Sequence, residues 1–193
     1  MGDLKVFAHK LVLASKSPRR SQLLREAGFQ FEKRTAEVEE VWPVSLPATE
    51  VAPYLARLKA RGSHHLLQPG EILLTADSVV ILDGRVLGKP VDRQAAIQML
   101  EQLSGRQHTV ITAVCLLSHA KEVVRVGRTE VWFYDMSPDE IAWYVDRYQP
   151  YDKAGAYGVQ EWIGLCRIKR LEGTYANVMG LPVDLVYEAL KEF

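Results

Sequence analysis

An apolar run that leads directly into a helix start, near the beginning of the chain, is the feature that most constrains the fold. Val6 to Ala14 is predicted to form a buried strand. Ser17 then supplies an N-cap and Pro18 favours the first helical position, so a helix is predicted from there to the stop at Gly28. A strand followed by a polar loop and a helix is the repeating unit of α/β proteins.

Strand-like and helix-like segments alternate along the rest of the chain. Strands are predicted at Phe29–Lys33, in two apolar runs over Ile72–Asp83 that Thr75–Ser78 interrupts, at His108–Leu117 and Glu122–Tyr134 as long antiparallel strands, and at Trp162–Leu171. Helices are predicted from Val51 to about Arg61, from Asp92 to Leu103, from the capping box at Ser137 to about Arg147, and from Pro182 onward. We therefore expect one α/β domain over residues 1–193, with a mixed, twisted sheet and helices on its faces.

Composition and charge exclude several classes of protein. Lys plus Arg and Asp plus Glu both number 24, so the formal net charge is zero, which argues against a broad surface for nucleic acid or an anionic membrane. Hydrophobic residues make up 48% of the chain, enough for a folded core. Cys115 and Cys166 lack any metal-binding spacing and are interpreted as reduced core thiols. Because Ser15 and Lys16 interrupt the first apolar run, we expect no signal peptide or anchor and a cytoplasmic protein.

Several polar residues that core packing does not explain follow predicted strands. Open α/β sheets place ligands at such positions. These residues are the basic pair Arg19 and Arg20, the carboxylates Glu37, Glu39 and Glu40, the lone Asp77, and the lysines Lys59, Lys89 and Lys153. Cations and carboxylates in separate loops are what a metal-bound polyphosphate requires.

Each of these features also has a simpler interpretation. A capped helix with solvated arginines explains the Ser17-Pro18-Arg19-Arg20 segment, although a helix N-terminus with two arginines is also suited to anions. Burying Asp77 without a partner is costly, which favours a functional carboxylate close to a strand end. Gly84 to Lys89 does not fit the Walker pattern, and Lys89 is as well explained by solvation as by phosphate binding.

Five motifs occur in order along the chain. They are Leu13-Ala14-Ser15 with Ser17-Pro18-Arg19-Arg20 and Leu23-Leu24; Ala76-Asp77-Ser78-Val79-Val80; Gly88-Lys89-Pro90; Leu103-Ser104-Gly105; and Asp152 to Gly158 with Gly180-Leu181-Pro182. With these motifs the chain resembles the Maf family of nucleotide pyrophosphatases over essentially its whole length.

The resemblance implies an inosine-triphosphatase-like (Maf/HAM1) fold with a cleft between two lobes. It also implies hydrolysis of a nucleoside triphosphate to the monophosphate and pyrophosphate, with a divalent cation as cofactor. The family's catalytic carboxylate corresponds to Asp77, acting as base, metal ligand or both, and its specificity positions correspond to Arg19, Ser78 and Gln160. We expect Glu40 and Asp77 to hold Mg²⁺ or Mn²⁺, and phosphate to be bound by Ser15, Arg19, Arg20, Lys59, Lys89 and Lys153.

The segment from Asp152 to Gln160 resembles the branch of the family that acts on dTTP and UTP. Two positions depart from the family pattern, because Ser78 replaces a usual Thr and Glu161 follows Gln160 where Gly is common. Two alternatives stay open: a pyrophosphatase that prefers 7-methyl-GTP, and a nucleotide-binding regulator of cell division or septum formation with little turnover. The expected partner is the nucleoside triphosphate, and we expect the protein to bind neither nucleic acid nor membrane. A second copy of the chain, forming a homodimer, is a further candidate partner.

Overall fold

The computed structural model describes residues 4–193, and the chain divides into two compact units. Unit 1 comprises the chain up to Asp77 together with Thr112–Gly127 and Gly180–Phe193. Unit 2 comprises Ser78–Ile111 and Arg128–Met179. Each unit is thus assembled from separate parts of the sequence. The single domain expected from the sequence stays a prediction.

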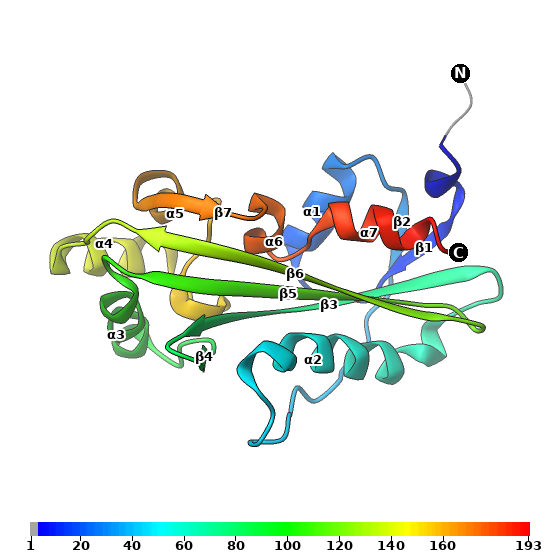
Figure 1. Cartoon of the computed structure of the whole chain (residues 1–193), viewed down its shortest axis with the longest axis horizontal. Coiled ribbons are helices and arrows are strands. Elements are labelled where there is room, and N and C mark those ends of the chain that lie inside the picture. The colour runs from blue at the N-terminus through cyan, green and yellow to red at the C-terminus, as the bar shows by residue number, and fades with distance from the viewer. Residues whose placement is uncertain (1–3) are drawn as a thin grey trace. The chain divides into compact units, whose positions relative to one another are not determined.

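The strands of residues 4–193 form a seven-stranded sheet in the order β2-β1-β3-β5-β6-β7, with β4 paired to β3. Strand β1 is parallel to β2 and β3, whereas β4 is antiparallel to β3 and β7 is antiparallel to β6. The predicted mixed sheet is therefore confirmed. Figure 1 shows the twist of the long strands β3, β5 and β6. The bounds are β1 Lys10–Leu13, β2 Phe31–Lys33, β3 Glu71–Leu82, β4 Arg85–Leu87, β5 Gln107–Leu117, β6 Glu122–Phe133 and β7 Ile168–Glu172.

In unit 1, helices cover the strands on both sides. Figure 1 shows α2 on one side and α1 and α7 on the other. The side chain of Ser17 accepts a hydrogen bond from the amide of Arg20, which confirms the predicted N-cap of α1. Val12, Leu67 and Leu73 form a buried cluster, against which Ala14 and Leu117 pack. The bounds are η1 Lys5–Ala8, α1 Pro18–Glu26, α2 Ala48–Gly62, η2 His64–Leu66 and α7 Val183–Leu190.

Unit 2 has a buried cluster that includes Leu100, Phe133, Tyr144 and Ile163. The capping box predicted at Ser137 is confirmed, because Ser137 and Glu140 exchange side-chain and backbone hydrogen bonds at the start of α4. The bounds are α3 Arg93–Leu103, α4 Pro138–Tyr148, η3 Ala154–Ala156, α5 Trp162–Cys166 and α6 Tyr175–Met179.

The first predicted strand was too long. Residues Lys5–Ala8 form a 3-10 turn, in which the amide of Phe7 donates to the carbonyl of Leu4 at 2.9 Å, and the strand begins only at Lys10. The ring of Phe7 packs against Phe29, with ring centroids 5.0 Å apart. We attribute the turn to this contact between Phe7 and Phe29, which is distant in sequence. Hydrophobic periodicity does not reveal such a contact.

The strand predicted at Trp162–Leu171 was wrong in its first half. Residues Trp162–Cys166 form α5, and only Ile168–Glu172 is extended. A Cβ atom at Gly164 would lie 1.8 Å from the carbonyl oxygen of Val159, so the helix closes on the preceding loop at a distance that only glycine permits. As a result Cys166 is exposed, which contradicts its interpretation as a core thiol, whereas Cys115 is buried as predicted.

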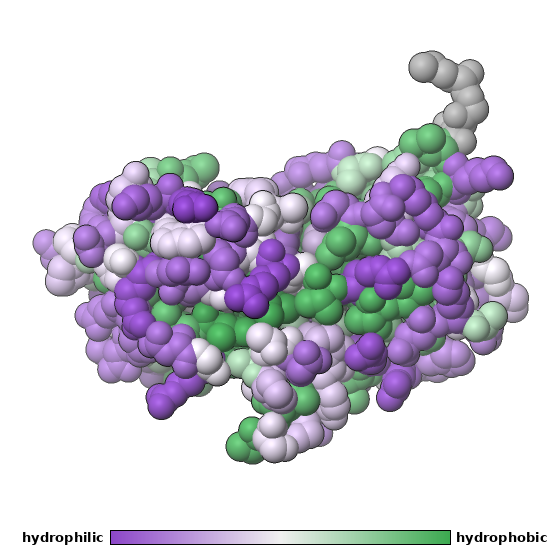
Figure 2. Space-filling model, in the orientation of Figure 1, coloured by the Kyte–Doolittle hydropathy of each residue, from purple (hydrophilic) through white to green (hydrophobic). Residues whose placement is uncertain are grey.

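The visible face in Figure 2 is mostly hydrophilic, and many of its hydrophobic residues gather in a patch across the middle. None of the helices in residues 4–193 is long and apolar enough to span a membrane.

Candidate functional site

Asp77 lies in the middle of β3, not near a strand end as predicted, and is only 6% exposed. The strand stays continuous because the carboxylate has a cationic partner, so its burial does not break the sheet. Lys59 of α2 places Nζ 2.6 Å from Oδ1 of Asp77. The hydroxyl of Thr75 donates to the carbonyl of Ala56 at 2.7 Å and so fixes this helix beside the strand.

The ammonium of Lys59 has a second carboxylate partner. Its Nζ lies 3.0 Å from Oε1 of Glu40, which belongs to the irregular segment before α2. We call Glu40, Lys59 and Asp77 the Lys59 cluster. Two carboxylates from separate elements therefore converge on one cation, as the metal hypothesis for Glu40 and Asp77 requires.

Burial raises the pKa of the Asp77 carboxyl above its ordinary value, against the opposing charges of Lys59 and Arg20. The charge of Glu40 acts in the same direction as burial. A buried carboxylate with a raised pKa accepts a proton more readily than an exposed one, which is the property required of a general base.

The guanidinium of Arg20 is hydrogen-bonded to the protein itself. Its Nε donates to the carbonyl of Gly180 at 2.8 Å, and its Nη1 donates to the carbonyl of Ala76 at 2.8 Å and to Oγ of Ser15 at 3.4 Å. Burial lowers the pKa of Arg20, while the charge of Asp77 raises it. Arg20 thus links the start of α1 to the strand that carries Asp77. The neighbouring Arg19 is half-buried.

The other carboxylates of the predicted acidic group lie outside the Lys59 cluster. Glu37 accepts a hydrogen bond from Lys16 at 2.8 Å, which lowers its pKa. Glu39 is exposed. Of the three carboxylates that the sequence groups together, Glu40 is the one that pairs with Lys59.

Unit 2 contains the remaining predicted residues. Lys153 is 8% exposed, and its Nζ lies 2.7 Å from Oδ1 of Asp152 and 3.1 Å from Oε1 of Glu161. Lys89 is exposed in the loop after β4, and the amide of Gly155 donates to the carbonyl of Gly88 at 3.1 Å. Two of the motifs, around residues 88 and 155, are therefore joined through their backbones.

Ser78 is half-buried and follows Asp77 directly in β3. It keeps the hydroxyl of the Thr that the family usually has at this position. Gln160 is also half-buried, and its Nε2 lies 3.5 Å from Oε1 of Glu161. The amide oxygen of Gln160 is buried, and residues 4–193 give it no hydrogen-bond partner.

Sequence reasoning did not assign a role to Glu161 or to Tyr144. The hydroxyl of Tyr144 donates to Oε2 of Glu161 and accepts from the amide of Gly158 at 3.0 Å. The only signal in the sequence was that Glu161 stands where the family commonly has Gly. Tyr144, in the apolar face of α4, gave none.

The residues present fit a divalent cation of the kind that is bound by few protein ligands. Within residues 4–193 there is no group of three or more His, Cys, Asp or Glu side chains that could hold a metal. Mg²⁺ is commonly bound through one or two carboxylates plus substrate phosphates and water. Glu40 and Asp77, which already converge on a cation, can supply the two carboxylates.

Comparisons with known proteins agree with this architecture. The structure of the Staphylococcus aureus Ham1 protein superposes with a TM-score of 0.55 at 15% identity, covering 95% of this chain and 98% of that one. The fold is therefore the Ham1-like mixed α/β fold that the sequence predicted.

The family model described as Maf-like protein matches residues 10–193, and the chain belongs to the Maf family. A Porphyromonas gingivalis protein named dTTP/UTP pyrophosphatase is 48% identical, with 96% of this chain and 94% of the relative covered. Proteins of the same name from Bacteroides thetaiotaomicron and Flavobacterium johnsoniae are 45% and 43% identical, with coverage of 95% and 96% of this chain and 96% of each relative.

Proposed function

We propose that this protein is a nucleoside triphosphate pyrophosphatase that acts on dTTP and UTP and releases the monophosphate and pyrophosphate. The observation that carries the proposal is Asp77, a buried carboxylate with a raised pKa that contacts the ammonium of Lys59. The names of relatives that are 43 to 48% identical over nearly the whole chain support the substrate assignment.

In the proposed reaction, a water oxygen forms a bond to the α-phosphorus and the bond to the β-phosphate breaks. Asp77 accepts the proton of that water, and pyrophosphate leaves with the bonding electron pair. Lys59 offsets the charge that develops on the phosphates. Further phosphate contacts are assigned to Ser15, Arg19, Arg20, Lys89 and Lys153.

A divalent cation, Mg²⁺ or Mn²⁺, is proposed as the cofactor. When bound, it supplies Lewis-acid stabilisation of the phosphate oxygens. Glu40 and Asp77 would hold it, with the ammonium of Lys59 beside them to balance their charges.

Recognition of the base is assigned to Gln160, with Arg19 and Ser78 holding the substrate in register. A carboxamide offers a donor and an acceptor side by side, which match O4 and N3–H of thymine or uracil. The buried amide oxygen of Gln160, without a partner in residues 4–193, supports this assignment.

We further infer that the protein acts in the cytoplasm. Because its positive and negative charges balance, we also infer that it binds neither nucleic acid nor membrane. Homodimer formation stays a prediction from the sequence.

The test is incubation of the purified protein with dTTP, UTP, dCTP, ATP and 7-methyl-GTP in Mg²⁺, with phosphate and pyrophosphate resolved. We expect pyrophosphate from dTTP and UTP, loss of activity in EDTA, and recovery on adding Mg²⁺ or Mn²⁺. Binding of nucleotides without pyrophosphate release would favour the regulator, and a preference for 7-methyl-GTP would place the protein in the other branch. Activity in excess chelator would overturn the metal assignment.

A further inference from the structure

The carboxylate of Glu161 contacts three side chains of unit 2, and its position beside Gln160 gives it a role that the proposed function does not include. We infer that Glu161 is a positioning residue that fixes the orientation of the Gln160 amide and thereby excludes cytosine nucleotides. This inference rests on the proposed function, since it concerns the choice among pyrimidine bases.

The position of Glu161 is set by two groups. Its Oε2 accepts a hydrogen bond from the hydroxyl of Tyr144, and its Oε1 lies 3.1 Å from Nζ of Lys153. Tyr144 is fully buried in the core of unit 2, and its hydroxyl is itself fixed by the amide of Gly158. With a side chain only 14% exposed, Glu161 is therefore held in place by the core and not by solvent.

This fixed carboxylate leaves Gln160 one favourable orientation. An ionised carboxylate only accepts hydrogen bonds, so the NH₂ group of Gln160 must face Oε1 of Glu161, as it does at 3.5 Å. Rotating the amide by half a turn would place its carbonyl oxygen against the carboxylate, two acceptors without a proton between them. The carbonyl oxygen therefore points away from Glu161, where it is buried and has no partner in the described chain.

The orientation of this amide decides which pyrimidine can bind. Thymine and uracil present a donor at N3 and an acceptor at O4, whereas cytosine presents an acceptor at N3 and a donor at N4. A Gln that is free to rotate can match either pattern by exchanging its two ends. A Gln whose NH₂ end is fixed matches only one of them, and the mismatched base leaves buried polar groups unpaired.

The packing around Gly158 independently supports the close contact between the side chains of Gln160 and Glu161. A Cβ atom at Gly158 would lie 2.8 Å from Nε2 of Gln160 and 2.8 Å from the carboxyl carbon of Glu161. Only a hydrogen atom fits beside both groups at once. Any side chain at residue 158 must therefore displace the amide or the carboxylate.

The test compares the ratio of kcat/KM for dTTP to that for dCTP in the wild type and in Glu161→Gln. The variant has nearly the same shape, but its own amide offers both a donor and an acceptor to Gln160, so the fixed orientation is lost. We expect the ratio to fall roughly tenfold or more, the size of one unpaired buried polar group. UTP and CTP should behave in the same way.

Two further variants separate this role from a merely structural one. Gly158→Ala should lower the same ratio by displacing the amide, without any change of charge. Glu172→Gln is the matched control, because Glu172 lies on the surface in β7 and pairs with Arg170 at 2.7 Å; its ratio should equal that of the wild type. Circular dichroism and thermal unfolding establish that each variant is folded.

The outcomes distinguish the inference from the proposed function. If the wild type hydrolyses neither dTTP nor UTP, the proposed function fails, and the inference fails with it. If the wild type prefers dTTP to dCTP, the proposed function stands. In that case an unchanged ratio in folded Glu161→Gln overturns the positioning role, even when total activity has dropped. Should that variant not fold, the ratio in Gly158→Ala decides in the same way.

Discussion

Strand β3 carries two buried carboxylates six positions apart, and their pKa values move in opposite directions. Glu71 at the start of the strand is 7% exposed and Asp77 in its middle is 6% exposed. The pKa of Glu71 is lowered, whereas that of Asp77 is raised. At Asp77 the effect of burial outweighs the charges of the facing cations, whereas at Glu71 the hydrogen bonds from Arg34 outweigh the effect of burial.

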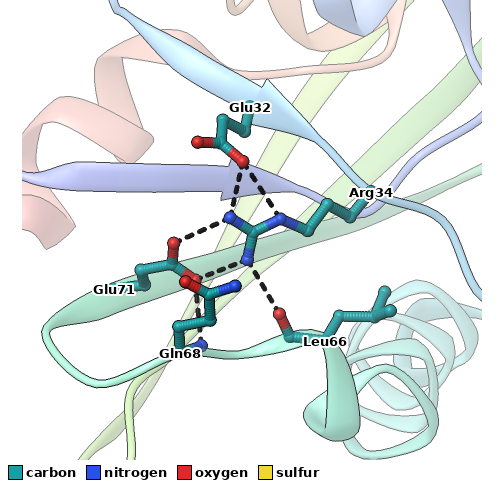
Figure 3. Close-up of polar contacts among 5 residues, drawn as sticks. All are labelled: Glu32, Arg34, Leu66, Gln68 and Glu71. Atoms are coloured by element: carbon teal, nitrogen blue, oxygen red, sulfur yellow. Dashed lines mark hydrogen bonds and ion pairs between the residues drawn. The ribbon is translucent and has the colours of Figure 1, made fainter.

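Glu71 has partners for both of its oxygens. Figure 3 shows the guanidinium of Arg34 between Glu71 and Glu32. Arg34 donates from Nη1 to Oε2 of Glu71 at 2.6 Å and from Nη2 to Oε1 at 2.8 Å, and the amide of Gln68 donates to Oε2 at 2.9 Å. The hydrogen bonds from Arg34 are the main cause of the lowered pKa of Glu71, and they also raise the pKa of Arg34.

Asp77 pairs with the ammonium of Lys59, which also pairs with Glu40. A point charge on a flexible stem compensates a buried carboxylate less completely than a bidentate guanidinium does. The comparison teaches that a buried carboxylate held by a bidentate guanidinium contributes to the fold, whereas one paired with an ammonium that a second carboxylate also contacts keeps the capacity to bind a proton, a metal or a substrate.

The largest expected effect is on catalysis. Asp77→Asn should lower the rate of pyrophosphate release by about 10² to 10⁴-fold, the usual cost of removing a general base. Thermal unfolding should show no loss of stability, because the substitution keeps the shape and removes a charge whose burial is unfavourable. A folded variant with near wild-type activity would show that Asp77 is not the catalytic carboxylate.

The next effect is on stability. Glu71→Gln should lower Tm by several degrees, because it leaves Arg34 with an incomplete set of acceptors. Pyrophosphate release by the folded variant should equal that of the wild type, which is the reverse of the Asp77→Asn result. Loss of activity at a temperature where the variant is folded would contradict the assignment of Glu71 to the fold.

A smaller effect is expected for the second carboxylate of the Lys59 cluster. Glu40→Gln should raise the Mg²⁺ concentration needed for half-maximal activity by on the order of tenfold, a size typical for losing one supporting group at a metal site. Glu39→Gln is the matched control and should leave the Mg²⁺ requirement unchanged. Equal shifts in the two variants would remove Glu40 from the proposed metal site.

The smallest effect is the pH dependence of stability. The folded pKa of Glu71 is below its ordinary value of about 4.3, so its stabilisation is complete above that pH and is lost as pH falls through the folded pKa. The folded pKa of Asp77 is above its ordinary value of about 3.9, so the stabilisation from its protonated form is present below that pH and is lost as pH rises through the folded pKa.

Urea unfolding across acidic pH tests this opposition. The free energy of unfolding of Glu71→Gln should be lower than that of the wild type, and this difference should shrink as pH falls. The free energy of unfolding of Asp77→Asn should rise relative to that of the wild type as pH rises. Two difference curves with the same slope would contradict the opposite pKa shifts of the two carboxylates.

Features fixed by neighbours in sequence were predictable. Ser17 with Pro18 and Ser137 with Pro138 mark helix starts because the capping side chain bonds to an amide three residues later. The positions of most strands could be predicted for a similar reason, because a run of apolar residues indicates a buried strand. The interruption at Asp77 was misread as a strand end, because Lys59 lies 18 positions away and its ion pair leaves no local pattern.

Features fixed by distant contacts were not predictable. Arg34 and Glu71 are 37 residues apart, and nothing in either segment indicates the other. The helix at Trp162 depends on the fit of Gly164 against a backbone carbonyl, which periodicity does not report. Asp77 was chosen from a motif, and Glu40 and Lys59 as polar residues that core packing does not explain; the Lys59 cluster shows that all three converge within unit 1.

Unit 1 has a consequence for how the protein is made. Its segments end at Asp77, Gly127 and Phe193, and the guanidinium of Arg20 reaches across 160 positions to the carbonyl of Gly180. A ribosome that has synthesised the first 77 residues has therefore not yet supplied the last segment of this unit. Independent domains fold one after another from the N-terminus during synthesis, but unit 1 cannot complete its folding in that order. Unit 1 completes its structure only when residues 180–193 have emerged, and a nascent chain stalled before then would lack the carbonyl to which Arg20 binds.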